Sequence, residues 1–252
     1  MSLKTAICML RECQMVNSSY DLRDIPTYSS KDAARYLGIP AATIRSWVYG
    51  RSYETKRGKQ QFHPLIKLSN PRIKQLSFTN LVEAHVLRAI RVVHGISMDK
   101  VRLSLDYLEQ ELNYNNPLVR AEFRTDGVDL FVKHLGKLVP ASTPQLSFLH
   151  EALIVHLDRI DVDEFCLANR LFPFGFQYPD SSLSFESQIP KSVVIDPRIS
   201  FGCTVLVGTG IPTAVLAQRY KFGESIFELA EDYRCDSSLI EEGIRWELPV
   251  AA

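Results

Sequence analysis

Apolar positions near the start of the chain recur at helical spacing in two short segments separated by a glycine. In the first segment they are Ala33, Ala34 and Leu37. Ser29 and Asp32 stand three residues apart, which is the spacing of a capping box, and the acid complements the helix dipole. Gly38 suits the left-handed conformation that ends a helix. The pattern therefore predicts a helix that begins near Ser30 and ends at the glycine.

The second segment begins after Pro40, a residue type that is tolerated at a helix start. Its apolar stripe consists of Ile44, Trp47 and Val48. The outward positions are then Ala42, Arg45, Ser46 and Tyr49. Small, hydroxyl and guanidinium side chains on one helix face can enter a DNA major groove and contact base edges or phosphates. The two segments together predict a helix-turn-helix, and an ordinary helical hairpin with a solvated face is the alternative.

Charge is distributed unevenly along the chain, although the 29 basic and 29 acidic side chains cancel. Residues 1–75 carry 13 basic and 5 acidic side chains, whereas residues 76–252 carry 16 and 24. Within residues 45–74 only Glu54 opposes Arg45, Arg51, Lys56, Arg57, Lys59, Lys67, Arg72 and Lys74. A stripe of this kind is the electrostatic footprint expected for a phosphate backbone. The charge pattern therefore favours DNA binding by the front of the chain.

Residues 51–68 are polar around Gly58 and end in apolar positions, which predicts a hairpin or loop beside the second helix. We interpret this segment as a wing, and a solvated charged loop is the alternative. We expect Arg45, Ser46 and Tyr49 to approach the groove, Thr43 and Arg51 to hold phosphates, and Arg57 and Lys59 on the wing to add salt-dependent affinity. A dimer on palindromic double-stranded operator DNA is expected.

In the middle of the chain the spacing of the apolar residues changes more than once between helical and strand-like periods. Apolar stripes predict helices over residues 79–94 and 98–112. Alternation around a turn-like Thr-Asp-Gly predicts a hairpin over residues 123–132, and residues 136–139 suggest a further strand. Helical spacing returns between residues 146 and 160. We therefore expect a mixed α/β middle segment.

A proline- and serine-rich stretch over residues 179–190 reads as a linker, and the chain after it predicts a compact unit of three helices. Residues 223–252 carry two basic and eight acidic side chains, which would repel phosphate. Such a unit suits protein contact, either self-association or capture of a basic partner. The candidate contact residues are Glu228, Glu231, Glu241, Glu242, Arg245 and Trp246. For the tryptophan, closure of the small unit's own core is the alternative.

Candidate chemistry for catalysis or metal binding is sparse. The five cysteines form no CxxC pair and the six histidines lack metal-ligand spacing. Phosphate-cradling glycine motifs and a GxSxG elbow are absent from the sequence. We therefore expect no catalytic residues, no metal and no cofactor, and a reducing, cytoplasmic location without a membrane span. Residues 1–14 read as a frayed extension or as an upstream start.

The predicted fold class is mainly α with a smaller β component. Its parts are an N-terminal winged helix-turn-helix, a mixed α/β middle and a C-terminal tri-helical, helix-turn-helix-like domain. The predicted boundaries are an extension at 1–26, a DNA-binding unit with wing and supporting helices at 27–115, a middle segment at 116–178, a linker at 179–190 and the tri-helical domain at 191–252.

Two sets of motifs resemble known families. The C-terminal unit resembles the uncharacterised domain of VapB-type antitoxins, in the runs at residues 195–202, 208–213, 223–226, 228–233 and 240–245. The front unit resembles a MerR-type helix-turn-helix in Tyr28, Ala33, residues 37–39, residues 43–45 and Trp47. The sequence departs from the antitoxin pattern at Cys203, Thr204 and Gly210, where relatives have a basic residue, a proline and often an arginine.

The resemblance implies one half of a bacterial toxin-antitoxin pair. The chain would bind and neutralise a PIN-like ribonuclease toxin and would repress its own operon by binding DNA. The alternative is a stand-alone MerR-like transcriptional regulator that senses a small ligand through residues 120–175. Its ligand cavity would be enclosed by Phe123, Phe131, Phe148, Phe165 and Phe172.

Overall fold

Two short helices joined by a glycine turn form the front of the molecule. They are α2 (Ser30–Leu37) and α3 (Ala41–Tyr49). The capping box is present, because Asp32 N donates to Ser29 Oγ at 3.2 Å and Ser29 N donates to Asp32 Oδ2 at 3.0 Å. Gly38 ends α2 in the left-handed region, with a φ of 61°. The predicted helix-turn-helix is confirmed.

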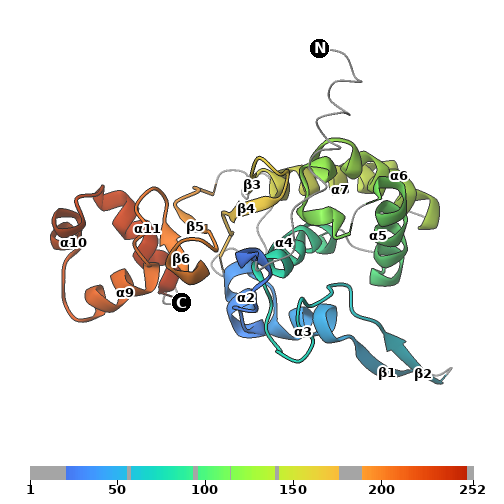
Figure 1. Ribbon diagram of the computed structural model, residues 1–252, viewed down its shortest axis with the longest axis horizontal. Helices are drawn as coiled ribbons and strands as arrows, with labels where there is room; N and C mark the ends of the chain where they lie inside the picture. Colours follow the sequence, from blue (N-terminus) through green and yellow to red (C-terminus); the bar gives the residue numbers. More distant parts are fainter. Residues whose placement is uncertain are drawn as a thin grey trace, which may run out of the picture.

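The computed structural model describes residues 21–55, 58–92, 96–113, 115–139, 142–175 and 189–248. Within these ranges the chain is mainly helical, with one two-stranded and one four-stranded sheet, as the sequence predicts. Helix α4 lies between the C-terminal helices at one end and helices α5 and α6 at the other (Figure 1). Most of the predicted extension and of the predicted linker falls outside the described residues.

The predicted wing is an antiparallel hairpin of β1 (Arg51–Thr55) and β2 (Gly58–Phe62). The hairpin projects from the body of the molecule beyond α3 (Figure 1). The chain enters it through Gly50, whose φ is +71°. A Cβ at this position would lie 2.4 Å from the carbonyl oxygen of Phe62, so the hairpin requires a glycine here.

Helix α4 (Phe78–Val92) is the centre of the molecule. Every residue from 81 to 90 is buried, including the polar residues Glu83, His85 and Arg88. A helix buried on all sides needs neighbours around its whole circumference. These include α2, α7 (Thr143–Leu157), strand β4 (Ala168–Leu171) and the 3₁₀ turns at Leu22–Asp24 and Pro117–Val119.

The prediction of a hairpin over residues 123–132 and a strand over 136–139 is wrong. The chain instead forms a π-helical turn (Phe123–Gly127) that continues into α6 (Val128–Leu138), which packs on α5 (Met98–Leu112) and α7. The apolar positions that seemed to alternate also fit a helical stripe, and Val128, Phe131 and Leu135 are the buried ones. The sequence in this segment is compatible with both a strand and a helix, and packing against α5 and α7 favours the helix.

Four short antiparallel strands form the second sheet, in the order β3 (Ile160–Val162), β4, β5 (Val193–Ile195), β6 (Thr204–Leu206). Strand β4 precedes the predicted linker and β5 follows it, and the two pair through Leu171 and Ile195. The sheet thus joins the middle segment to the C-terminal unit across the segment that the sequence reads as a linker.

The C-terminal unit contains the three predicted helices, α9 (Thr213–Lys221), α10 (Ile226–Tyr233) and α11 (Ser237–Glu247). They close over a small core made of Val193, Leu206, Leu216, Leu229, Ile240 and Ile244. None of the helices that the structure describes is long and apolar enough to cross a membrane.

The C-terminal unit is attached to the back of the helix-turn-helix by specific contacts. Arg35 Nη1 of α2 lies 2.5 Å from Glu247 Oε2 of α11. The buried hydroxyl of Tyr28 donates to the carbonyl oxygen of Gly202 at 3.0 Å. A Cβ on Gly202 would lie 2.3 Å from that hydroxyl, so this approach also requires a glycine. These contacts lie on the side of α2, which leaves the outward face of α3 uncovered by them.

A buried cluster of aromatic and cationic groups holds α4, α7 and the chain after β4 together. Arg88 and Arg159 place their guanidinium carbons 4.7 Å and 4.6 Å from the centroid of the Phe174 ring. His156 donates from Nδ1 to the carbonyl of Ala152 at 2.9 Å, so its Nε2 accepts from Arg88 Nη1 at 3.0 Å. Both nitrogens of this imidazole are therefore satisfied only in its neutral form.

His85 lies in the same cluster, with its ring centroid 5.1 Å from that of His156. Burial lowers the pKa of His85 to about 3, and hydrogen bonding to the carbonyl of His156 opposes the shift in part. Burial, together with the charges of Arg88 and Arg159, also lowers the pKa of His156 well below its ordinary value. Both imidazoles are neutral in the folded protein and protonate near pH 6.5 when it unfolds.

We expect this pair to make the protein sensitive to acid. Because the folded pKa values are depressed, their contribution to stability is present above about pH 6.5 and is lost as the pH falls. Each histidine then lowers the free energy of unfolding by about 1.4 kcal/mol per pH unit. Urea unfolding at pH 7 and pH 5 measures the loss. His156→Gln should reduce the pH dependence by one proton. Equal pH dependence in the variant and the parent would contradict this assignment.

Candidate nucleic-acid interface

The outward face of α3 is open, as the sequence predicts for a recognition helix. Ile44, Trp47 and Val48 are buried on its inner face. Arg45 is exposed in the middle of its outer face, and Ser46 beside it is partly exposed. A guanidinium and a hydroxyl are thus presented from a helix whose orientation is fixed by a buried tryptophan.

A hollow of about 430 Å³ lies next to this face. It is bounded by α3, the hairpin, the last turn of α4 and the start of α5. The lining residues are Ala42, Thr43, Ser46, Trp47, Arg51, Phe62, Arg91, Ser97, Met98 and Asp99. The hollow thus brings Arg51 of the hairpin and Arg91 of α4 together with the hydroxyl groups of Thr43 and Ser46 on α3. Asp99 adds one acidic side chain to its wall.

Arg91 is a candidate functional residue that sequence reasoning missed. It stands in the last turn of α4, and its Nη1 donates to Thr43 Oγ1 at 2.5 Å. The side chain is exposed on the hollow's wall. The helix stripe marks Arg91 as a solvated position, and only the crossing of α4 behind α3 brings it to this surface.

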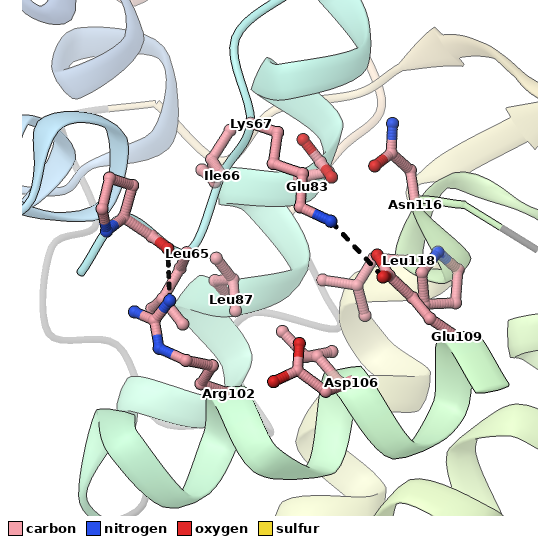
Figure 2. Close-up of a pocket in the computed structure, with 13 residues that line it drawn as sticks. Leu65, Ile66, Lys67, Glu83, Leu87, Arg102, Asp106, Glu109, Asn116 and Leu118 are labelled. Carbon is pink, nitrogen blue, oxygen red and sulfur yellow. Dashed lines mark hydrogen bonds and ion pairs between the residues drawn. The ribbon is translucent and has the colours of Figure 1, made fainter.

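The hairpin is braced from behind by α5. The Arg102 guanidinium lies 5.4 Å from the centre of the Phe62 ring and donates to the carbonyls of His63 and Pro64, the latter at 2.5 Å. Figure 2 shows Arg102 reaching from α5 toward the segment that follows β2. Backbone N–H groups of Leu65 and Ile66 then donate to the carbonyl of Trp47 at 2.7 Å and 3.1 Å. The wing is therefore anchored to both α3 and α5.

The other predicted DNA-binding residues are placed as follows. Tyr49 is half exposed, and its hydroxyl donates to the carbonyl of Lys74 at 3.0 Å, which ties the end of α3 to the chain after the wing. Arg51 is exposed at the first position of β1. Lys59 lies in β2, and Arg57 lies outside the described residues. Thr43, Ser46 and Arg51 thus line one hollow, and Arg45 is exposed on the same helix as the first two.

A small pocket behind the wing is of a different kind. It has a volume of about 50 Å³ and lies between α4, α5 and the chain after the hairpin. Lys67 reaches Glu109 across it, with 3.4 Å between Nζ and Oε2 (Figure 2). Buried Glu83 also lines it, accepts from Asn80 Nδ2 at 3.0 Å, and has its pKa raised by burial to about 7. Ligand sites measure about 300–1,000 Å³, so this space suits water rather than a small molecule.

The five phenylalanines of the ligand-sensing alternative do not enclose one cavity. Phe123 and Phe131 pack edge to face in the main core, with ring centroids 6.2 Å apart. Phe172 belongs to a separate small cluster. Phe148 and Phe165 are exposed by about 40%. In the described ranges, moreover, no three His, Cys, Asp or Glu side chains are grouped so that they could hold a metal ion.

The predicted partner-binding residues lie on the C-terminal helices. Glu228 caps α10, where its Oε2 accepts from Ser225 N at 2.7 Å, and this hydrogen bond lowers the pKa of the carboxyl group. Glu231 is exposed on the same helix. On α11, Glu241 and Glu242 pair with Arg245 at 2.6 Å and 2.7 Å. The acids are accessible, while the arginine is engaged by its own helix.

Trp246 is placed differently from these acids. It packs against both the main core and the small C-terminal core. Its ring lies so close to Gly175 that a Cβ there would be 2.4 Å away. This position favours the structural alternative raised for the tryptophan, because the ring fills the junction between the C-terminal unit and the chain that precedes the predicted linker.

Two protein-family models match separate parts of the chain. Residues 26–105 match the model of a putative DNA-binding HTH domain, and residues 193–245 match the model described as a protein of unknown function (DUF433). The first match covers α2, α3, the hairpin, α4 and the start of α5. The helix-turn-helix thus has independent support as a DNA-binding domain.

Similar proteins extend over most of the chain. The "putative antitoxin VapB45" of Mycobacterium tuberculosis is 29% identical over 220 residues, which is 83% of this chain and 89% of that protein. The "uncharacterized protein Rv2308" of the same organism is 22% identical over 93% of this chain and 94% of its own length. The crystal structure of Rv2018 from M. tuberculosis shares the fold, with a TM-score of 0.60 and 22% identity over 88% of this chain and 98% of that one.

Proposed function

We propose that the protein is a DNA-binding antitoxin, which binds and neutralises a PIN-like ribonuclease toxin and represses its own operon. The observation that carries the DNA-binding part is the open face of α3, with exposed Arg45 beside an anchored wing. The end-to-end similarity to a putative antitoxin supports the antitoxin part. No role in catalysis is proposed.

In this proposal α3 enters the major groove and Arg45 contacts a base edge or phosphate there. A phosphate strand passes over the hollow, where Arg51, Thr43 and Arg91 surround it, and the wing follows the neighbouring backbone. Two copies bind a palindromic operator, in the manner of MerR-like regulators. Residues 27–115 form the DNA-binding unit.

The C-terminal unit, residues 191–252, holds the toxin. Its acidic surface repels DNA and complements the basic surface that an RNA-cleaving protein needs for its substrate. The unit is fastened to the helix-turn-helix through Arg35 and Glu247, so a toxin bound to it travels with the DNA-binding unit. The same chain then represses the operon through the helix-turn-helix and neutralises the toxin through the C-terminal unit.

The DNA-binding part is tested with Arg45→Ala and the DNA upstream of the protein's own reading frame. We expect the variant to lose discrimination against unrelated DNA by about 1–3 kcal/mol, because the base contact is removed while phosphate contacts stay. Gel-shift titrations at fixed salt measure it. Lys137→Ala, which removes an exposed charge on α6, is the control and should bind like the parent. If Arg45→Ala binds as tightly and selectively as the parent, α3 is not the recognition helix.

The antitoxin part is tested by co-expression with the product of the adjoining reading frame. We expect the two proteins to purify together, and the ribonuclease activity of the partner to fall as this chain is added. The reason is that a bound antitoxin occupies or covers the basic surface that RNA requires. Separate elution of the two proteins, with ribonuclease activity unchanged by an excess of this chain, would refute the pairing.

A further inference from the structure

Two phenylalanines at one corner of the C-terminal unit are far more exposed than their residue type explains. Phe222 is the C-cap residue of α9 and is 79% exposed, and Phe227 is the second residue of α10 and is 66% exposed. The short turn between the two helices separates them. We call Phe222 and Phe227 the aromatic corner. Aromatic residues are enriched in protein interfaces, so two exposed phenylalanines on one short turn are a candidate contact surface.

The corner is held rigid by an ion-pair network. Arg219 of α9 donates from Nε to Glu224 Oε1 in the turn at 2.9 Å and from Nη1 to Asp232 Oδ2 of α10 at 2.6 Å. Its guanidinium also lies 5.1 Å from the centre of the Tyr233 ring. A surface fixed in advance loses little conformational entropy when a partner binds. The network therefore holds together the ends of the two helices that carry Phe222 and Phe227.

The surroundings of the corner are acidic. Residues 219–248 carry eight acidic and four basic side chains, and Arg219 is already engaged by two of the acids. Glu228 and Glu231 are exposed on α10, the helix that contains Phe227. Hydrogen bonds from Ser225 lower the pKa of the Glu228 carboxyl group. An apolar centre with an acidic rim is complementary to an apolar pocket with a basic rim.

The acidic surroundings of the aromatic corner favour some binding partners over others. A second copy meeting this corner symmetrically would place one acidic rim against another, which is repulsive. DNA would be repelled for the same reason. A basic protein satisfies both parts of the surface, and a ribonuclease, which must attract RNA, is basic around its active site.

We propose that the aromatic corner is the docking site for the partner protein, with Phe222 and Phe227 entering an apolar pocket whose rim carries lysine and arginine. The inference rests on the proposed antitoxin function and replaces Trp246 by these two rings as the apolar anchor. In Figure 1 the α9–α10 corner lies at the end of the molecule opposite the hairpin and α5. A partner docked there leaves the face of α3 open to DNA.

The test compares variants of the full-length chain in binding to the purified product of the adjoining reading frame. Phe222→Ser with Phe227→Ser should weaken binding by about 30-fold or more, because both anchors are lost. Glu231→Lys should weaken it several-fold, and more strongly at low salt, because it reverses a rim charge without touching the Glu228 cap. Phe148→Ser, at a 39% exposed phenylalanine on α7, is the matched control and should bind like the parent.

Operator gel shifts and size-exclusion chromatography accompany each binding measurement. Unchanged operator binding shows that a variant is folded. If the parent binds the partner and the double variant binds equally well, the corner is not the docking site, although the antitoxin function stands. If the double variant instead changes the oligomeric state with partner binding intact, the corner is a self-association surface and the inference is wrong. If the parent itself does not bind the partner, the proposed function fails and the inference fails with it.

Discussion

The complete burial of α4 is the constraint on which the rest of the structure depends. Because residues 81–90 have no exposed face, the elements that cover them must all be in place at once. These elements include α2, α7 and strand β4 of the second sheet. The helix also carries its functional neighbours: its last turn brings Arg91 to Thr43, and Arg88 on its buried face joins Arg159 and His156 around Phe174. The surface around Thr43 and the junction to the C-terminal unit thus both depend on α4.

The junction gives the two ends of the molecule a fixed relation. Arg159 donates to the carbonyls of Phe172 and Ile189 at 2.6 Å and 2.8 Å, so it holds together the chain before and after residues 176–188. Strands β4 and β5 pair across the same interval, and Arg35 contacts Glu247 on the outside. The exposed face of α3 and the acidic surface of the C-terminal unit are therefore separate in position but mechanically connected. That arrangement suits the proposed function, in which one surface binds DNA and the other binds a protein partner.

Local signals in the sequence predicted the parts of the fold that local interactions determine. The capping box of α2, Gly38 and the stripe of α3 are read within a few residues, and the structure has all of them. The helix over residues 128–138 was missed because Val128, Leu130 and Val132 also alternate, and only packing on α5 and α7 distinguishes the two periods. Arg91 and Arg102 act through helix crossings that no spacing reveals. The exposure of Phe222 and Phe227 is not evident from their spacing in the sequence. Trp246, for which the sequence left an interface anchor and core closure as alternatives, packs against both cores.

In the proposed function, one chain holds operator DNA and its protein partner at the same time, through opposite ends. The mass of the particles formed when this chain, the upstream DNA and the product of the adjoining reading frame are mixed, determined by analytical ultracentrifugation, tests this directly. We expect a single species that contains all three components. Release of DNA in proportion to the partner added, with only binary complexes present, would contradict it.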